Sequence, residues 1–117
     1  MDISVSDSGT YKIITLKGKI DWEDAHKIDK EVSSLINEGF VHIAFIFDEV
    51  ISICSALIGA LVFNLNKAKK VNGIFCLISS NKDVNFVFET LKFDIVFDGY
   101  LFNSLEDFRK EILDKEK

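Results

Sequence analysis

The chain has 117 residues, of which 48% are hydrophobic and 28% are charged, and its formal net charge is −5. This length predicts a single domain spanning residues 1–117, because most domains hold about 50 to 250 residues. The acidic balance excludes a broad basic surface that would grip a phosphate backbone, so we expect no nucleic-acid binding. No apolar run approaches the roughly 18 residues needed to cross a bilayer, so we expect no membrane span.

The N-terminal residues and the cysteines indicate where the protein works. No basic segment followed by an apolar core opens the chain, so we expect a cytoplasmic protein without a signal peptide. Cys54 and Cys76 are too few for a disulfide scaffold and fit a reducing compartment as free thiols. Neither cysteine stands at metal-ligand spacing from His26 or His42, so we expect no metal ion and no cofactor.

A β-hairpin and a helix are expected first. Apolar and polar residues alternate in residues 3–5 and 11–16, on either side of a turn at residues 8–9, as in two paired strands. Asp21 then stands where it can cap a helix, and apolar residues recur at helical spacing until Gly39 ends the pattern.

Strands and helices alternate along the rest of the chain. Residues 40–47 and 74–78 are almost wholly apolar, which is typical of central strands, and the pair Asp48-Glu49 is expected to end the first of them. A short extended piece is expected at residues 50–53. Helices are expected over about 54–71, over 81–91 and after a cap at Ser104, with a brief final strand at 95–97.

This order of elements predicts an α/β fold. Parallel strands joined by helices make right-handed crossovers, and the first hairpin adds an antiparallel member at one side. We therefore expect a two-layer domain with a mixed four-to-five-stranded sheet and helices mainly over one face. Most of the eleven Phe side chains have their place in its core or in a dry interface.

The segment that most clearly suggests a function is residues 51–61, where a strand-like stretch turns into a helix. Ser55 stands at the start of this helix, where free N–H groups and the helix dipole favour an anion, so a phosphate on Ser55 would be accommodated. The alternative is that Ser55 or Ser52 is merely the N-cap. Cys54 is either activated by the same field or, as is more common for such thiols, simply packed.

The helix after this turn is more apolar than a single buried stripe requires. Leu57, Leu61 and Leu65 share one face, and Ile58 and Val62 lie beside it. Two explanations remain open for the surplus: a partner that binds Ile58 and Val62, or neighbouring elements of this chain that cover them.

These residues resemble the STAS family, whose domain is shared by bacterial anti-sigma factor antagonists and the cytoplasmic tails of sulfate transporters. The family's Asp-Ser-Ser-Gly-Leu-Gly run at a strand-to-helix turn is similar to residues 54–59, where Cys54, Ala56 and Leu57 replace its Asp, second Ser and first Gly. The Gly-Lys-Ile-Asp of residues 18–21 resembles the family's Gly-Glu-Leu-Asp. The order of elements agrees over nearly the whole chain.

The resemblance implies a STAS-like fold and a non-enzymatic anti-sigma factor antagonist. In such antagonists the first serine of the run is phosphorylated by the partner anti-sigma factor, which is itself a serine kinase, and phosphorylation ends binding. The matching phosphoacceptor here is Ser55. The expected partner-binding residues are Asp21, Cys54, Ser55, Ala56, Ile58, Gly59 and Val62.

Two other functions stay open at this point. The domain could be a STAS module that is never phosphorylated and serves as a subunit or scaffold in a transporter or signalling assembly. It could also be a small hydrolase or thiol enzyme using Cys54, although the neighbouring sequence offers that thiol no His or carboxylate partner. The sequence makes no prediction of oligomeric state.

Overall fold

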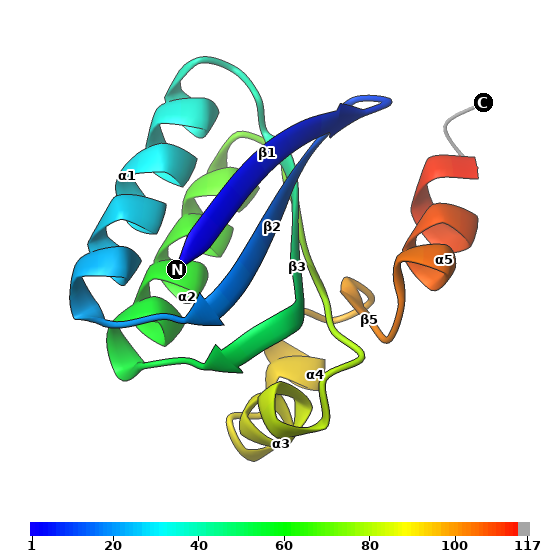
Figure 1. The fold of residues 1–117 in the computed structure, drawn as a ribbon. Helices are drawn as coiled ribbons and strands as arrows, with labels where there is room; N and C mark the ends of the chain where they lie inside the picture. The colour runs from blue at the N-terminus through cyan, green and yellow to red at the C-terminus, as the bar shows by residue number, and fades with distance from the viewer. Residues whose placement is uncertain (115–117) are drawn as a thin grey trace.

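A computed structural model describes residues 1–114 (Figure 1). Five strands of this region form one sheet in the order β1-β2-β3-β4-β5. These strands are β1 (Asp2–Ser8), β2 (Tyr11–Lys19), β3 (His42–Ser52), β4 (Ile74–Ile78) and β5 (Leu101–Phe102). The helices are α1 (Trp22–Asn37), α2 (Ser55–Lys70), α3 (Lys82–Thr90), α4 (Phe93–Val96) and α5 (Leu105–Phe108), with a π-helical continuation η1 (Arg109–Leu113).

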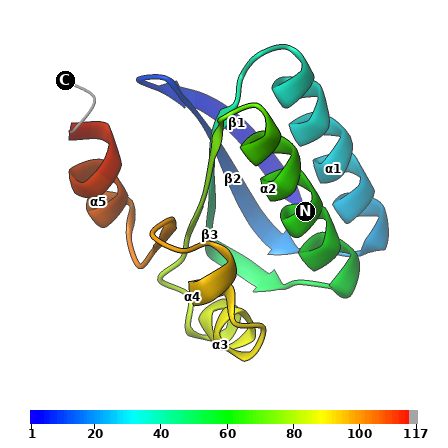
Figure 2. The ribbon, with the colours of Figure 1, turned by 180° about the vertical axis from the view of Figure 1, so that it is seen from behind.

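The sheet separates the helices into two unequal layers. Helices α1 and α2 cover one face, with α3 and α4 at one end of the same side, and α5 packs against the other face, as Figure 2 shows from behind. Strand β1 is antiparallel to β2, and the other strand pairs are parallel. The predicted α/β fold, with a mixed sheet and helices mainly over one face, is therefore confirmed.

Helix α1 begins where the sequence predicts. Asp21 Oδ1 accepts a hydrogen bond from the backbone N–H of Asp24 at 2.9 Å, and Asp24 Oδ2 accepts one from the N–H of Asp21 at 3.1 Å. This reciprocal pair satisfies N–H groups that would otherwise be left free at the helix start. The helix then buries four apolar side chains: Ala25, Ile28, Val32 and Ile36.

Strand β3 is longer than predicted. The strand expected to end at Asp48-Glu49 and the separate piece expected at 50–53 form one strand that runs to Ser52. Both acidic side chains are exposed, whereas Val50 is buried. The prediction is wrong because charged residues at exposed positions do not end a strand when its neighbour continues. Here β2, after two register shifts, pairs with β3 as far as Ser52.

The prediction of a strand at residues 95–97 is also wrong. These residues belong to helix α4 and its C-cap, and the last strand is the two-residue β5. A three-residue apolar run does not distinguish a strand from one turn of helix. The helical turn directs Phe93 and Phe97 into the core together, with ring centroids 4.9 Å apart.

Aromatic rings connect the elements of the main core, as the sequence predicts for a Phe-rich chain. Most Phe side chains are buried, and the exceptions, Phe40, Phe63 and Phe86, are exposed. A continuous chain of ring contacts joins the sheet to α3 and α4. Its members, with centroid separations between 4.9 and 6.1 Å, are Phe45, Phe47, Phe88, Phe93, Phe97 and Phe75.

Helices α3 and α5 start at polar caps. Asn81 accepts hydrogen bonds from the N–H groups of Asp83 and Val84 at the start of α3, and Ser104 Oγ accepts one from Asp107 N–H at the start of α5. The Ser104 cap confirms the predicted start of the last helix. Within residues 1–114, no helix is both long enough and apolar enough to cross a membrane.

Gly73, between α2 and β4, provides a test of the packing. A Cβ at this position would overlap the carbonyl oxygen of Val41. We expect Gly73→Ala to lower the free energy of unfolding by about 1–3 kcal/mol, as overpacking does elsewhere.

Gly59→Ala is the matched control, because a Cβ there meets nothing within 4 Å. It should raise stability by about 0.5–1 kcal/mol, since Ala is the better helix former. Urea denaturation followed by circular dichroism measures both, and equal stabilities would contradict the packing described.

Candidate functional site

The turn from β3 to α2 lies beside the start of α1. The backbone N–H of Ile20 donates to the carbonyl of Ser52 at 3.1 Å, which ties the end of β2 to the end of β3. Helices α1 and α2 therefore start at the same edge of the sheet, after Asp21 and after Cys54 respectively, and pack against each other (Figure 1). This edge is the carboxyl end of parallel strands, the usual position of sites in α/β proteins.

Ser55 is the first residue of α2 and is exposed. The N-cap is Cys54, whose side chain makes no capping hydrogen bond, so the interpretation of Ser55 or Ser52 as the N-cap is wrong. Within residues 1–114, neither the Ser55 hydroxyl nor the backbone N–H groups of Ser55 and Ala56 have a hydrogen-bond partner. A free hydroxyl beside two free N–H groups is an arrangement that accommodates a negative group on Ser55.

Some apolar side chains of helix α2 are buried in the core, and others lie on the flanks of the helix. Ile58 and Val62 are half-buried and pack against the core, so other elements of this chain cover part of the surplus apolar surface. Phe63 is 60% exposed and is the most exposed large apolar side chain on α2. The buried residues of the helix are Leu57, Leu61, Asn64, Leu65 and Ala68.

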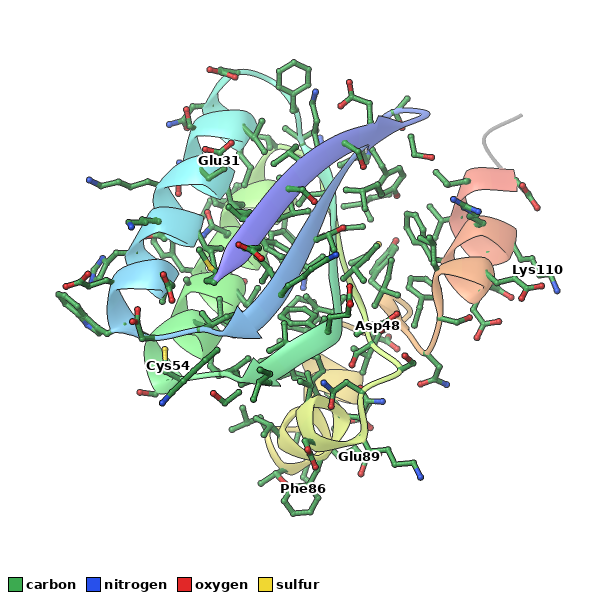
Figure 3. The ribbon with its side chains drawn as sticks, in the orientation of Figure 1. Glu31, Asp48, Cys54, Phe86, Glu89 and Lys110 are labelled. Atoms are coloured by element: carbon green, nitrogen blue, oxygen red, sulfur yellow. The ribbon has the colours of Figure 1, made fainter. Side chains whose placement is uncertain are left out.

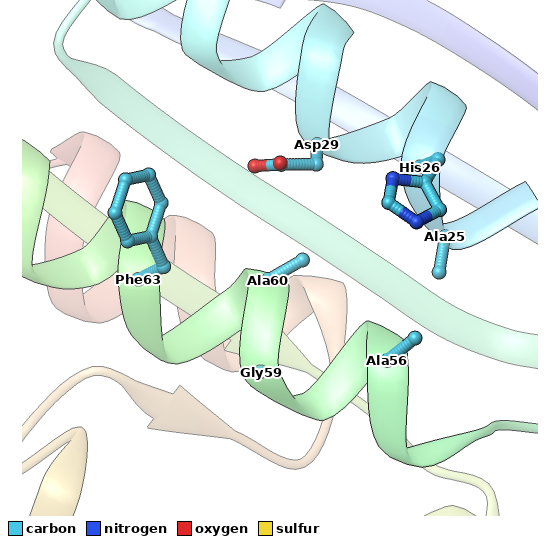
Figure 4. Close-up of a pocket in the computed structure, with 7 residues that line it drawn as sticks. All are labelled: Ala25, His26, Asp29, Ala56, Gly59, Ala60 and Phe63. Atoms are coloured by element: carbon cyan, nitrogen blue, oxygen red, sulfur yellow. The ribbon is translucent and has the colours of Figure 1, made fainter. Parts of the chain in front are cut away.

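A groove of about 190 Å³ lies between α1 and α2, starting at the residue after Ser55. Figure 4 shows the His26 ring and the Phe63 ring toward its two ends, with the Asp29 carboxylate between them. The α2 side is otherwise formed by small residues, which keep the groove open. Its lining consists of Ala25, His26 and Asp29 from α1 and Ala56, Gly59, Ala60 and Phe63 from α2.

A partly buried polar network joins the two helices beside this groove. Asn64, only 1% exposed, donates from Nδ2 to Asp29 Oδ1 at 2.7 Å and to the carbonyl of Ala60 at 2.9 Å. Its Oδ1 accepts a hydrogen bond from Ser33 Oγ at 2.9 Å. These three bonds satisfy the side chain and fix its orientation, because a rotated amide would turn its oxygen toward the carboxylate.

Among residues 1–114, the titratable groups near the turn form no recognisable catalytic arrangement. Cys54, at the start of α2 in Figure 3, is half-buried, and Cys76 is buried on the opposite face of the sheet. His26 packs against Trp22, with ring centroids 4.3 Å apart, whereas His42 packs against Tyr11. In the described region, no group of three or more His, Cys, Asp or Glu is placed to hold a metal ion.

The structure brings together some predicted site residues and adds others. Asp21, Cys54 and Ser55 meet at one edge of the sheet, and Ala56 and Gly59 continue into the groove. The sequence analysis did not identify Asp29, Phe63 or Asn64 as site residues. One signal was present: a polar Asn in an apolar helix, following small residues on the same face, is typical of a close helix–helix contact.

Asp21 has a structural role that can be separated from binding. The backbone N–H of Asp24 donates to its carboxylate and lowers its pKa below the ordinary 3.8. A carboxyl with a lowered pKa stabilises the fold above that ordinary value, and the contribution is lost as the pH falls through the lowered pKa. Asp21→Ala should therefore lower the melting temperature more at pH 7 than at pH 2.

Asp21→Asn is the matched control for that experiment, because an Asn oxygen still accepts the Asp24 N–H but carries no charge. It should melt closer to the parent at pH 7 than Asp21→Ala does. Thermal unfolding followed by circular dichroism at both pH values measures the difference. A melting-temperature loss for Asp21→Ala that is the same at pH 7 and pH 2 would contradict a stabilising charge on this cap.

The two thiols should differ sharply in reactivity. Burial raises the pKa of Cys76 from 9.0 to about 12, which lowers its thiolate population at pH 8 roughly a thousandfold. A thiol-reactive chromophore should therefore label Cys54 in the native protein and Cys76 only after unfolding. The Cys54→Ala variant should show no native labelling; rapid labelling of that variant would place Cys76 outside the core.

The chain is similar to solved structures along nearly its whole length. The Thermotoga maritima protein TM1081 matches with a TM-score of 0.85 and 22% identity, over 95% of this chain and 94% of that one. An anti-sigma factor antagonist from Mycobacterium paratuberculosis matches with a TM-score of 0.83 and 16% identity, over 96% and 93%. The phosphorylated form of the Bacillus cell fate determinant SpoIIAA matches with a TM-score of 0.76 and 17% identity, over 99% and 100%.

At these identities the structural likeness shows a shared fold and no more. No curated protein sequence matches the chain significantly. The STAS domain family, in contrast, matches residues 2–108 in sequence, a range that includes the whole sheet, helices α1 to α5 and the turn at Ser55. The protein belongs to the STAS domain family.

Proposed function

We propose that this protein is an anti-sigma factor antagonist that binds a kinase-type anti-sigma factor in the cytoplasm and is switched off by phosphorylation of Ser55. It acts through binding and catalyses no reaction of its own. Its binding surface is the start of α2 together with the adjoining flanks. The contributing residues are Asp21, Cys54, Ser55, Ala56, Ile58, Gly59 and Val62.

The observation that carries this proposal is the position of Ser55. Its hydroxyl is exposed at the first residue of α2, beside N–H groups that have no partner among the described residues. The structurally similar SpoIIAA, an anti-sigma factor antagonist, is known in both an unphosphorylated and a phosphorylated form. A STAS domain with a free serine at this turn is therefore well suited to a phosphorylation switch.

The switch follows from the charge of a phosphate, about −1.5 to −2 at neutral pH. In the free domain this charge is tolerated, because the start of a helix favours a nearby exposed anion by about 0.3–1 kcal/mol. In a complex the same charge would be removed from water against the apolar surface of the turn. Burying an unpaired anion costs several kcal/mol. Each loss of about 1.4 kcal/mol weakens binding tenfold, so the phosphorylated protein releases its partner without unfolding.

A second function is favoured by two replacements in the family's serine motif. Cys54 and Ala56 stand where the family pattern has Asp and a second Ser, so a kinase that recognises the carboxylate would not modify Ser55. The domain would then be an unphosphorylated STAS module in a transporter or signalling assembly.

Phosphorylation can be tested directly. Each kinase-type anti-sigma factor encoded in the genome of the source organism is incubated with this protein and ATP, and the product is analysed by mass spectrometry. Phosphate on Ser55 supports the switch. Binding without phosphate supports the unphosphorylated module, and an absence of binding to any of these factors contradicts the proposal.

A phosphomimetic substitution tests the consequence for binding. We expect Ser55→Asp to weaken binding to the anti-sigma factor by at least about tenfold. The melting temperature should stay close to that of the parent, because Ser55 is exposed and an anion is favourable at this helix start. Isothermal titration calorimetry and thermal unfolding measure the two effects.

The matched control for this substitution is Ser6→Asp, which adds the same charge at an exposed position of the edge strand β1. Its affinity should be close to that of the parent. If Ser55→Asp binds as tightly as Ser6→Asp, charge at the turn does not control binding and the switch fails, while the fold assignment is unaffected.

A further inference from the structure

The groove between α1 and α2 contains the Asp29 carboxylate, which is hydrogen-bonded within the protein through only one of its two oxygens. Asp29 Oδ1 accepts the 2.7 Å hydrogen bond from Asn64 Nδ2 and lies 3.4 Å from Ser33 Oγ. In residues 1–114, Oδ2 has no hydrogen-bond partner. No buried side-chain oxygen there lacks a partner, so Oδ2 is open to solvent. The carboxylate is therefore oriented from one side and available to a donor from the other.

The walls of the groove suit a flat cation. The Phe63 ring, 60% exposed, is directed along one side of the space in which the Asp29 carboxylate lies (Figure 4). Ala56, Gly59 and Ala60 leave room beside that ring. A cation over an aromatic face, with a carboxylate at its edge, combines cation–π attraction with charge-assisted hydrogen bonding.

The size of the groove restricts what can bind. At about 190 Å³ it is smaller than the 300–1,000 Å³ usual for cofactor and small-molecule sites. It fits the end of one side chain. The protein's net charge of −5 also favours a basic group over an acidic one.

We propose that this groove is a receptor for one arginine side chain of the partner protein, with Asp29 Oδ2 accepting hydrogen bonds from the guanidinium and Phe63 stacking on its plane. The identity of the partner rests on the function proposed above, whereas the chemistry of the groove does not. Arginine fits better than lysine because its planar, multiply donating head can use the ring and the carboxylate together, which a compact ammonium cannot.

Asn64 acts in this arrangement as a positioning residue. It does not line the groove, but its Nδ2 donates to the oxygen of Asp29 that faces away from the incoming arginine. Loss of that bond would leave Asp29 Oδ1 with only the longer contact from Ser33 Oγ and would free the carboxylate to rotate. Asn64→Leu should therefore weaken recognition of arginine without touching the ligand.

The affinity of groove variants for the anti-sigma factor tests the proposed arginine receptor. Asp29→Asn keeps an oxygen for Asn64 but presents an NH2 group to the groove, so it should weaken binding about tenfold or more. Phe63→Leu should weaken it severalfold, whereas Phe63→Tyr should retain it. The matched controls, which should leave affinity unchanged, are Glu31→Gln on α1 and Phe86→Leu on α3 (Figure 3). If Asp29→Asn and Phe63→Leu bind the anti-sigma factor as tightly as the parent while Ser55→Asp still weakens binding, the arginine receptor is overturned. The proposed function is then unaffected.

A titration without the partner tests the groove independently. The 15N-labelled protein is titrated with N-acetyl-arginine amide and, separately, with N-acetyl-lysine amide, up to about 100 mM. Arginine amide should shift the amide signals of residues 25–29 and 56–63, and lysine amide should shift them less than half as much. Asp29→Asn should abolish the arginine shifts. Localised shifts would support the receptor even if no anti-sigma factor binds. Shifts that are absent, dispersed or unchanged in Asp29→Asn would overturn it.

Discussion

The hydrogen bond between Ile20 N–H and the Ser52 carbonyl fixes the two strand ends from which the site is built. It continues the pairing of β2 with β3 to the point where each strand leaves the sheet, so α1 and α2 begin next to each other. The Asp21 capping box then sets where α1 starts, and α2 starts directly after Cys54 without a side-chain cap. The turn at Ser55 and the groove beyond it both follow from this common starting edge, because each needs the first turns of the two helices in contact.

Local patterns in the sequence predict most of the elements correctly. The helix capped by Asp21 and the last helix capped by Ser104 were both predicted, because a cap and the residues it serves are near neighbours in the chain. The error at residues 95–97 has the opposite cause. Whether a short apolar run becomes a strand or a helical turn depends on what it packs against, and here Phe97 packs against Phe75 of β4, with ring centroids 6.1 Å apart.

In the candidate site, too, one part could be predicted from the sequence and another part could not. Ser55 could be predicted because it lies at a strand-to-helix turn that is visible in the sequence. The groove could not, because Asp29 and Asn64 are 35 positions apart and neither stands out until the helices meet. Helical periodicity indicates only that Phe63 lies off the stripe formed by Leu57, Leu61 and Leu65. Only the structure shows that its ring lies along the groove and that Ile58 and Val62 are half-covered by the core.

The contact between α1 and α2 combines apolar packing with a network of polar hydrogen bonds. Apolar packing alone would hold two helices together but would leave their relative rotation weakly specified. A satisfied polar network specifies one arrangement, because any other would leave Asn64 or Asp29 desolvated and unpaired. The same network leaves one carboxylate oxygen free at the rim of the groove. The network that fixes how α1 packs against α2 is therefore also the network that orients the Asp29 carboxylate.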